Sequence, residues 1–511
     1  MNAYWGEEMA AITRAQTASS SNPYLAALIS PEGAWDTSTT VTYFFDDGQG
    51  KAWTDAEIAA IEAGYQTWAN VANITFTRVF DAGSANIVNQ LLTAVALGGS
   101  EADAQLPING GSNIGLQTRY NFESASWAQI NSGGDGFYTI VHEIGHSIGL
   151  EHTHDGTTFP GVPVNEDQNT GTNAQNQAIF SVLSYVVGWT GQPVPSLASG
   201  QAATPMAYDV AAVQAMYGAN TNYNTGNNTY TLFTADGSGV GWTAIWDAGG
   251  TDTITGATAT SSLVIDLREA PLSGENGGGY VSWVNGVAGG YTIANGVTVE
   301  NAIGGSANDT MTGNSAANQF TGNAGNDTMD GGDGLDVAIY GATRASVTVS
   351  ITDTTAAGTI TATSAGLGTD TVTNIERIQF SDGTLAFDLT GAAGQTYRLY
   401  QAAFDRTPDD AGLSHNVNLM DGGLGIFDMA AAFIASAEFQ QTYGENVNDT
   451  TFITLLYNNV LNRAPDDAGL SGWQDAINGG QSRAQVLFGF SESTENKANV
   501  SSAIDDGIWL V

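Results

Sequence analysis

The feature that most constrains the fold of this chain is a run of four nine-residue units that begins at Gly304. The units read GGSANDTMT, GNSAANQFT, GNAGNDTMD and GGDGLDVAI, and they follow one another without a gap. Glycine tolerates the positive φ angles of tight turns, and each unit also carries an apolar residue at its eighth position. Each unit therefore predicts a turn followed by a short strand, and consecutive units are expected to stack into one all-β structure.

The repeat is close to the pattern G-G-x-G-x-D-x-U-x of calcium-binding parallel β-rolls, in which U is apolar. Alternate turns stack on the same side of such a roll, so acidic positions 18 residues apart are expected to share an ion. The pairs are Asp309 with Asp327 and Asn318 with Asp336. The apolar positions, expected inside the roll, are Met311, Phe320, Met329 and Ala338. The alternative, a flexible linker rich in Gly and Asn, is disfavoured because four units keep one register.

The charge balance of the 511 residues is strongly acidic, with 52 Asp and Glu against 12 Lys and Arg and a formal net charge of −40. Such a surface repels nucleic acid and anionic lipid, which excludes both as expected partners. The acidity is typical of adaptation for solubility or high salt. It also fits carboxylates that bind calcium, a hard cation that takes oxygen ligands, and both explanations can hold together.

Two absences narrow the function further. The chain has no cysteine, which excludes disulfides, thiolate zinc sites and a cysteine nucleophile. No stretch approaches the roughly 18 apolar residues that a membrane span needs. The N-terminus also lacks the basic start and apolar run of a secretory signal peptide. Any export is therefore expected to use a route that does not depend on an N-terminal signal.

The N-terminal part alternates strand and helix patterns. Residues 38–45, 74–80 and 84–92 predict strands, and residues 54–72 predict an amphipathic helix that begins with a capping box of Thr54 and Glu57. This order predicts an α/β or α+β domain that ends near residue 220. From 220 to 390 the helical patterns vanish and Gly, Asn, Asp and Thr dominate.

The C-terminal part is helical and contains a second repeat. Residues 399–414 match residues 456–471 at an offset of 57, and Ser436 and Glu438 match Ser493 and Glu495 at the same offset. Each copy contains a turn of the form R-x-P-D-D-A-G-L. We expect the arginine of each turn to pair with one of its two aspartates. The candidates are Arg406 with Asp409 or Asp410, and Arg463 with Asp466 or Asp467.

Three of the five histidines lie in the stretch HEIGHSIGLEH, residues 142–152. His142 and His146 are four residues apart and so share one face of a helix, where both can bind one ion at about 2.1 Å. Gly149 can take the left-handed conformation that ends a helix and returns His152 as a third ligand. Three neutral imidazoles and one open position predict a single catalytic zinc, which lowers the pKa of bound water to about 7. Glu143 lies where it can accept a proton from that water.

The remaining two histidines, His154 and His415, fit no position of this pattern, and His154 is expected to lie on the surface near the site. A chance H-E-x-x-H in an ordinary helix is the alternative reading. It is disfavoured because five positions match H-E-x-x-H-x-x-G-x-x-H in a chain with so few histidines.

This stretch resembles the metzincin zinc endopeptidases and, within them, the serralysins. Four other stretches extend the resemblance over about residues 23–390: SVLSY (181–185), TPMAYDVAAVQAMYGAN (204–220), IWDAGGTDTI and GVTVENAIGG. The expected fold is multidomain: an α+β metzincin zinc-protease domain, an all-β parallel β-roll and a small all-α repeat domain. Leu183 stands where the family has the methionine of its Met-turn, and we expect this apolar substitution to cost little activity.

The resemblance implies roles for individual residues. His142, His146 and His152 are the implied zinc ligands, Glu143 is the implied general base, and Tyr185 is implied to stabilise the oxyanion of the tetrahedral intermediate. Several structural calcium ions are also implied. Their ligands fall on Asp247, Gly249, Gly250, Asp252, Thr298 and Glu300, and on Gly304, Gly305, Asp309, Gly322, Gly325, Asp327, Gly331, Gly332, Gly334 and Asp336. A further site built on backbone carbonyls falls near Asn224, Gly226 and Asn228.

The predicted domains follow from these patterns. Residues 1–22 are a propeptide or a flexible N-terminus, 23–220 the catalytic domain, 221–390 the calcium-binding β-roll, and 395–511 a helical domain of two repeats with a C-terminal secretion signal. The last residues, SSAIDDGIWLV, resemble the signal of type I secreted calcium-roll proteins. A buried terminal strand is the alternative for the same residues.

The predicted function is a secreted, calcium-stabilised zinc metalloendopeptidase that cleaves proteins or peptides outside a bacterial cell. The type I secretion machinery is an expected partner. The alternative is a non-enzymatic cell-surface or matrix-binding protein that uses the roll and the C-terminal repeats, and these repeats could also attach an active enzyme to a surface layer. A zinc hydrolase of non-peptide substrates has no positive feature in the sequence.

Overall fold

A computed structural model describes residues 21–36, 40–48, 51–108, 113–351, 360–364 and 366–511. The expected propeptide or flexible N-terminus therefore lies outside the described residues, except for residues 21 and 22. The chain forms two compact units. The N-terminal unit comprises Met1–Ala316 with Gly322–Thr328, and the C-terminal unit comprises Ala317–Thr321 with Met329–Val511. The predicted domain boundaries differ from these unit limits and stay predictions.

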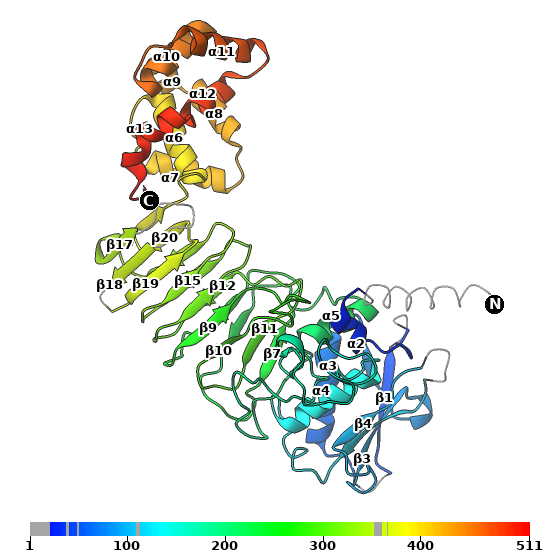
Figure 1. Cartoon of the computed structure of the whole chain (residues 1–511). Helices are drawn as coiled ribbons and strands as arrows, with labels where there is room; N and C mark the ends of the chain where they lie inside the picture. The colour runs from blue at the N-terminus through cyan, green and yellow to red at the C-terminus, as the bar shows by residue number, and fades with distance from the viewer. Residues whose placement is uncertain (1–20, 37–39, 49–50, 109–112, 352–359, 365) are drawn as a thin grey trace, which may run out of the picture. The chain divides into compact units, whose positions relative to one another are not determined.

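The N-terminal unit begins with a mostly parallel sheet, in the strand order β2-β1-β3-β5-β4 for its described residues. The pairs β1–β2, β1–β3 and β3–β5 are parallel, and β4 pairs antiparallel with β5. Strands β1, β3 and β4 are labelled in Figure 1. Three of these strands confirm the sequence-based strand predictions. The bounds are β1 Val41–Asp46, β2 Phe76–Arg78, β3 Ile87–Leu92, β4 Ala102–Ala104 and β5 Leu116–Asn121.

Helix α3 (Asp55–Val71) packs against helix α4 (Asp135–Ser147), which carries the first two histidines of the motif. The predicted capping box is confirmed, because Thr54 accepts from the Glu57 backbone N–H while the Glu57 carboxylate accepts from the Thr54 N–H. The buried Trp68 of α3 donates its indole N–H to the Val141 carbonyl of α4 at 3.0 Å. This contact holds the histidine helix against the sheet domain. Two further helices are α2 (Pro23–Leu28) and α5 (Ala207–Tyr217).

The same unit continues into the first coils of the roll. One sheet has the order β13-β9-β10-β11-β7 within this unit, and the facing strands have the order β12-β8-β6. All these pairs are parallel except those of β10. The bounds are β6 Thr229–Thr231, β7 Trp242–Ile245, β8 Thr253–Thr255, β9 Leu263–Asp266, β10 Ser282–Val284, β11 Gly290–Ile293, β12 Asn301–Ile303 and β13 Thr310–Thr312.

The C-terminal unit contains the later coils, with the orders β17-β18-β19-β15 and β22-β21-β20-β16-β14. The bounds are β14 Gln319–Thr321, β15 Thr328–Asp330, β16 Val337–Ile339, β17 Val347–Ile351, β18 Ile360–Ser364, β19 Gly368–Thr373, β20 Arg377–Phe380, β21 Gly383–Ala386 and β22 Ile508–Leu510.

The nonapeptide predictions are confirmed at the level of packing. The four apolar positions are at most 1% exposed. The Asp309 backbone N–H donates to Asp327 Oδ1 at 2.9 Å, and the Asn318 N–H donates to Asp336 Oδ1 at 2.7 Å. Residues 18 apart therefore stack on one another as the repeat predicts.

Eight helices follow in the C-terminal unit, and the first four recur at the sequence offset in the last four (Figure 1). Their shared core includes Leu399, Phe433, Leu456 and Phe490. The bounds are α6 Ala392–Phe404, α7 Asp410–Asp421, α8 Ile426–Ala435, α9 Ala437–Tyr443, α10 Asp449–Leu461, α11 Asp467–Asn478, α12 Arg483–Ser491 and α13 Thr494–Ile504.

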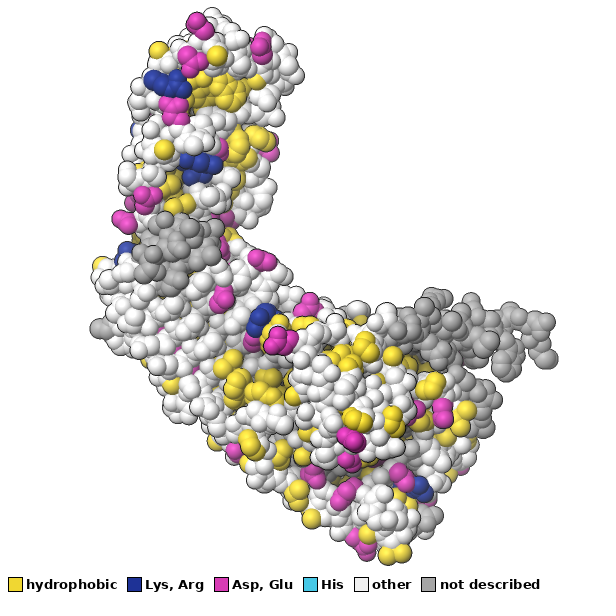
Figure 2. All heavy atoms as spheres, in the orientation of Figure 1, with side chains coloured by type: hydrophobic (Ala, Val, Ile, Leu, Met, Phe, Trp, Pro, Cys, Tyr) yellow, Lys and Arg dark blue, Asp and Glu magenta, His cyan; other side chains and the backbone are white. Residues whose placement is uncertain are grey.

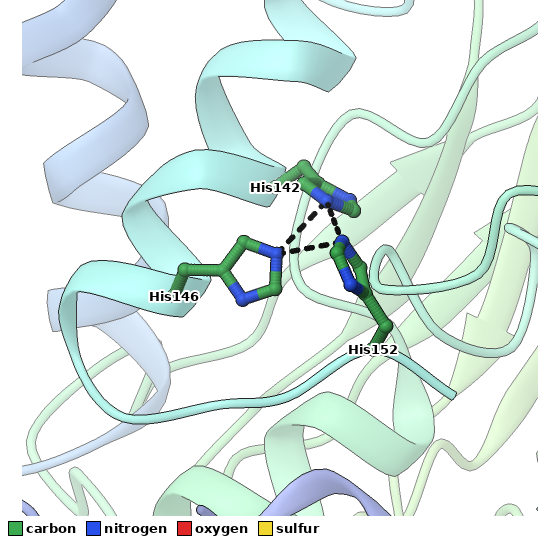
Figure 3. Close-up of side chains that lie close together, drawn as sticks. All are labelled: His142, His146 and His152. Carbon is green, nitrogen blue, oxygen red and sulfur yellow. Dashed lines mark hydrogen bonds between the residues drawn. The ribbon is translucent and has the colours of Figure 1, made fainter. Parts of the chain in front are cut away.

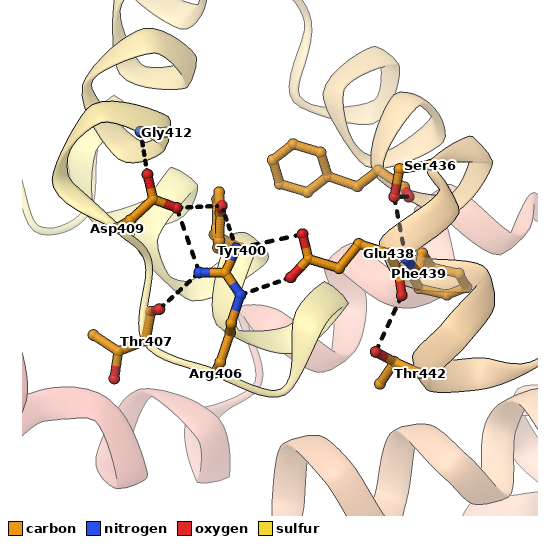
Figure 4. Close-up of polar contacts among 10 residues, drawn as sticks. Tyr400, Arg406, Thr407, Asp409, Gly412, Ser436, Glu438, Phe439 and Thr442 are labelled. Atoms are coloured by element: carbon orange, nitrogen blue, oxygen red, sulfur yellow. Dashed lines mark hydrogen bonds and ion pairs between the residues drawn. The ribbon is translucent and has the colours of Figure 1, made fainter.

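The arginine of each repeat turn contacts one of the predicted aspartates and one residue that the prediction missed. Arg406 lies 3.4 Å from Asp409 but makes its shorter pair, at 2.6 Å, with Glu438 of α9 (Figure 4). Arg463 repeats this arrangement with Asp466 at 3.7 Å and Glu495 at 2.7 Å. The other candidates, Asp410 and Asp467, are instead the first residues of α7 and α11.

The last residues form strand β22, which pairs antiparallel with β21. Ile508 and Leu510 are buried, so packing accounts for the apolar residues of this stretch, as the alternative reading predicted. Among the described residues, none of the helices has the length and apolarity that crossing a bilayer requires. Figure 2 shows Asp and Glu side chains scattered over the visible face, whereas Lys and Arg are sparse on it.

Candidate metal centre and active site

The three histidines of the motif converge at the end of helix α4 (Figure 3). His142 and His146 lie one turn apart on the helix, which ends at Ser147. Gly149 follows with φ = 102°, and a Cβ there would lie 2.7 Å from the Gly33 carbonyl oxygen. Only glycine fits this reversal, which brings His152 back to the helix as predicted.

The Nε2 atoms of the three rings form a small triangle. The distances are 3.1 Å from His142 to His146, 3.2 Å from His142 to His152 and 2.9 Å from His146 to His152. Zinc bound at about 2.0–2.1 Å from each nitrogen in tetrahedral geometry needs nitrogens about 3.3 Å apart. The triangle is therefore of the size that one zinc ion requires.

Hydrogen bonds on the opposite side of each ring fix the tautomers. The Nδ1 atom faces the Val182 carbonyl at 2.6 Å in His142, the Leu150 carbonyl at 2.7 Å in His146 and the Asp155 carboxylate at 2.7 Å in His152. These partners are acceptors, so each Nδ1 carries the hydrogen and donates it. The three Nε2 lone pairs then face one point, which is the donor set of a zinc centre.

Burial keeps the three rings neutral. Desolvation lowers the pKa of His146 to about 4 and that of His152 to about 2, and it lowers the pKa of His142 well below its usual value. Neutral imidazole is the form that binds metal. The ligands are therefore available at neutral pH without the loss of a proton.

Glu143 lies on α4 beside the triangle and is buried, with only 6% of its surface exposed. Its Oε2 has no hydrogen-bond partner among the described residues. Burial, with a smaller effect of the Asp103 charge, raises the pKa of Glu143 to about 8. A cation nearby favours the ionised form, so this carboxylate can exchange a proton close to neutral pH.

Tyr185 lies beside two of the three histidine rings. Its ring centroid is 4.7 Å from that of His152 and 5.6 Å from that of His142. The residue is 40% exposed, and burial of its hydroxyl raises the Tyr185 pKa to about 12. The hydroxyl therefore remains protonated at neutral pH and can donate a hydrogen bond.

The prediction that His154 lies on the surface is wrong. His154 is 5% exposed, and its ring stacks on His152 with centroids 4.9 Å apart. Its ring centroid also lies 4.6 Å from that of Tyr185. The chain turns inward after His152 because Phe159 and Thr153 are buried and hydrogen bonded to each other through their backbones.

The segment that contains the expected Met-turn position is held by α5. Leu183 is fully buried below the site, as expected for apolar packing. Asp209 of α5 accepts from the Ser181 hydroxyl at 2.6 Å and from the Val182 N–H at 2.7 Å. Because the Val182 carbonyl accepts from His142, Asp209 supports the metal centre through the backbone of Val182.

The sequence-based reasoning did not single out Asp155 or Asp209. Asp155 had a local signal, since a carboxylate three residues after a ligand histidine can reach the Nδ1 of that ring. Asp209 lies 27 residues from the backbone group that it supports, and no spacing rule identifies such a partner.

The calcium positions expected in the first coil come together. The Asp252 N–H donates to Glu300 at 2.7 Å, the Asn228 N–H donates to Asp252 Oδ1 at 2.7 Å, and the Gly249 N–H donates to Asp247 at 3.0 Å. Asp252 Oδ2 is buried and has no hydrogen-bond partner in the described part of the chain. Gly250 has φ = 144° and lies against the Gly226 carbonyl. The Asn224 amide donates a hydrogen bond to the Tyr230 hydroxyl, which in turn donates to the Asp247 carboxylate. Thr298 is exposed and lies two residues before Glu300.

In the nonapeptides, side-chain oxygens of the acidic positions lie against glycines of the repeat. Asp309 Oδ2 accepts from the Gly305 N–H at 2.6 Å, and a Cβ at Gly304 would lie 2.7 Å from that oxygen and 2.8 Å from the Gly322 carbonyl. Among the nonapeptide glycines expected to contribute calcium ligands, Gly325, Gly332 and Gly334 have positive φ. Gly322 lies against Asp327, and Gly331 lies against Asp336. Carboxylate and carbonyl oxygens in such number fit calcium by their chemistry.

Comparisons with known proteins cover most of the chain. Residues 34–174 match the family described as Matrixin, residues 207–409 match Peptidase M10 serralysin C terminal, and residues 430–500 match a domain of unknown function, DUF4214. A serralysin from Photorhabdus laumondii subsp. laumondii is 37% identical over 277 residues, which are 52% of this chain and 54% of that protein. Serralysin C from Dickeya chrysanthemi is 34% identical, over 50% of this chain and 53% of that protein.

The chain thus spans about half the length of the curated relatives it matches. A solved structure of myroilysin aligns at 20% identity over 38% of this chain and 99% of its own, but its TM-score of 0.25 carries no argument. The two family matches and the named relatives agree with the histidine motif and the roll. In its matrixin and serralysin C-terminal regions, they support the resemblance of this chain to serralysin-type metzincins.

Proposed function

We propose that this chain is a calcium-stabilised zinc metalloendopeptidase that hydrolyses peptide bonds of extracellular proteins. The observation that carries the proposal is the convergence of three Nε2 lone pairs beside the buried carboxylate of Glu143, whose Oε2 has no hydrogen-bond partner among the described residues. A purely structural zinc site has four protein ligands, whereas this triangle leaves one position open. The serralysin resemblance supports the same activity.

When bound, zinc supplies a Lewis acid that polarises the peptide carbonyl and makes water more acidic. The histidines hold that ion through Nε2, while Val182, Leu150 and Asp155 keep each ring in the required tautomer. Glu143 accepts the proton of the attacking water at its free Oε2 and returns it to the leaving amine. Tyr185, protonated at neutral pH, donates a hydrogen bond to the oxyanion.

We further propose that the protein acts outside a bacterial cell after type I secretion and that the C-terminal helical repeats attach it to a surface layer. The resemblance to calcium-roll proteins and the acidic carboxylates support the first part. The match to a domain of unknown function leaves the partner of the repeats open. A non-enzymatic binding protein is not favoured, because Glu143 and the ligand set are intact.

The test compares wild type with Glu143→Gln and with Glu32→Gln, which removes an exposed carboxylate far from this motif in sequence. Each protein is prepared in calcium, its zinc content is measured, and cleavage of casein is followed. We expect Glu143→Gln to retain zinc and lose roughly 10²–10⁴-fold in kcat, and Glu32→Gln to match wild type. Zinc-loaded wild type that cleaves neither casein nor a peptide library would contradict the proposal, as would a fully active Glu143→Gln.

A further inference from the structure

The last nonapeptide unit of the roll pairs with a segment that contains no nonapeptide. Along the repeat, the N–H of one acidic position donates to the carboxylate of the next coil, as Asn318 does to Asp336. The Asp336 N–H in turn donates to Glu376 Oε2 at 2.8 Å. The N–H groups of Glu376 and Arg377 return to the Asp336 carbonyl at 3.2 and 3.1 Å. Glu376 therefore takes the place of the acidic residue that a further unit would provide.

One oxygen of this pair is left without a hydrogen-bond partner in the described part of the chain. Asp336 is fully buried, and its Oδ2 makes no hydrogen bond among the described residues. A Cβ at Gly331 would lie 2.5 Å from this oxygen and would also collide with the carbonyl oxygen of Asn374. The two oxygens therefore face the same small space, which exists because residue 331 is glycine.

The surroundings of this space are acidic. Burial raises the pKa of Asp336 to about 7, and the charges of Glu376, Asp330 and Asp333 add to the effect. The neighbouring cation, Arg377, is engaged elsewhere, with Asp421 at 2.5 Å and Asp388 at 3.3 Å. A buried carboxylate in this setting is stabilised by a hard cation with oxygen ligands, and calcium accepts both carboxylate and backbone carbonyl oxygens.

The same arrangement occurs in the N-terminal unit. Asp252 donates its N–H to Glu300 at 2.7 Å, and its carbonyl accepts from Glu300 and Asn301 at 3.3 and 2.9 Å. Asp252 Oδ2 is also buried without a hydrogen-bond partner among the described residues. Serralysin resemblance implies calcium at Asp252 and Glu300, whereas nothing in the nonapeptide pattern points to Glu376.

We infer that Asp336, Glu376 and the Asn374 carbonyl form a calcium site that closes the last coil of the roll. The inference deepens the proposed function, because it rests on calcium stabilisation of the same fold. The site also acts on the helical region. Arg377 directly follows the ligand Glu376, is 8% exposed, and holds Asp421 at the end of α7. Calcium that orders Glu376 therefore also orders the arginine that anchors α7.

The experiment uses the full chain and three charge-matched variants. Glu376→Gln keeps an acceptor for the Asp336 N–H but removes the charge. Glu300→Gln makes the same change at the equivalent position of the N-terminal unit, and Glu445→Gln removes an exposed carboxylate in the helical region. Bound calcium per chain is measured by titration calorimetry after chelation, and hydrogen exchange is followed by mass spectrometry in calcium and in magnesium.

We expect Glu376→Gln to bind one calcium fewer than wild type and to exchange faster in β20 and α7. Glu300→Gln should also lose one calcium but leave α7 unchanged, and Glu445→Gln should match wild type. Unchanged stoichiometry and exchange in Glu376→Gln would overturn the inference. If this variant does not fold, hydrogen exchange of the wild type tests the inference. Calcium, but not magnesium, must protect residues 372–380 from exchange, and the lack of that protection would overturn the inference.

Casein cleavage and zinc content of the same samples separate the two proposals. An active enzyme without a calcium effect at Glu376 contradicts only the closing site. An inactive enzyme whose calcium count falls in Glu376→Gln contradicts only the proteolytic function.

Discussion

The histidine centre and the carboxylate rows of the roll are built in opposite ways. The three histidines lie within 11 residues of sequence, are neutral, and have their tautomers fixed by hydrogen bonds to the protein. The carboxylates come from separate coils, and Asp336 and Glu376 are 40 residues apart. Several of them are charged groups in buried positions. Neutral donors can be preorganised without their metal, whereas buried charges destabilise the fold until a cation binds.

The largest expected effect is that of calcium removal. A site held at about 100 times its Kd adds about 2.7 kcal/mol to stability, so several sites together add on the order of 10 kcal/mol. That is comparable to the whole stability of a typical domain. We expect EGTA to lower the midpoint of the thermal transition of the roll strongly, followed by circular dichroism, and 1,10-phenanthroline to lower it much less. Equal losses with the two chelators would remove the contrast between the two regions.

Preorganisation of the histidine centre is tested next by Asp155→Asn. Asp155 orients His152 through Nδ1 at 2.7 Å, and loss of such a partner typically weakens metal affinity by about 10–100-fold. The measurement is a zinc titration against a competing chelator. Asp167→Asn is the control, since Asp167 is an acidic residue of the following loop for which no ligand contact is expected. An unchanged zinc affinity in Asp155→Asn would show that the rings are held without it.

The two regions should also differ in their response to pH. Burial raises the pKa of Asp336 to about 7 and that of Asp252 to about 6, above the unfolded value of about 3.9. The folded state then binds more protons than the unfolded state between pH 4 and 7, so calcium-free stability falls as pH rises through this window. Urea unfolding in EGTA at pH 5, 6, 7 and 8 measures how the calcium-free stability depends on pH. Stability that increases with pH in this range would contradict the assignment of buried charge to the roll.

The smallest effect is expected from Leu183→Met. Leu183 is fully buried against Gly145 of α4, and a swap of similar volume usually costs less than about 1.5 kcal/mol. We expect a shift of a few degrees in the thermal midpoint and kcat/KM within a few-fold of wild type. A large loss of activity with zinc still bound would show that the side chain at this position tunes the centre electronically, which simple packing does not explain.

Local patterns predicted the local structure well. The capping box of Thr54 and Glu57 and the reversal at Gly149 are present as expected. These features depend on residues within one turn of each other, so the sequence contains all the information that they need. The stacking of Asp309 on Asp327 was also predictable, because a repeat converts distance along the chain into a fixed step in space.

Predictions were incomplete or wrong where two remote segments meet. Arg406 does pair with Asp409 of its own turn, as expected, but its shorter pair is with Glu438, which the prediction missed although the repeat offset already linked Glu438 to Glu495. His154 was expected at the surface because it lies outside the motif, but the packing of the following loop buries it against Tyr185. In both cases the missing information was which elements lie side by side.

The sequence by itself determined the donor atoms of this protein. The spacing of His142, His146 and His152 and the register of the nonapeptides specify which side chains share a face, because helices and repeats have fixed periods. Only the tertiary structure decided how those donors are supported. Three contacts depend on how separate segments pack. Asp155 anchors His152, Asp209 supports the Val182 backbone, and Asp336 pairs with Glu376. Packing depends on the burial of the whole chain, and no local period encodes it.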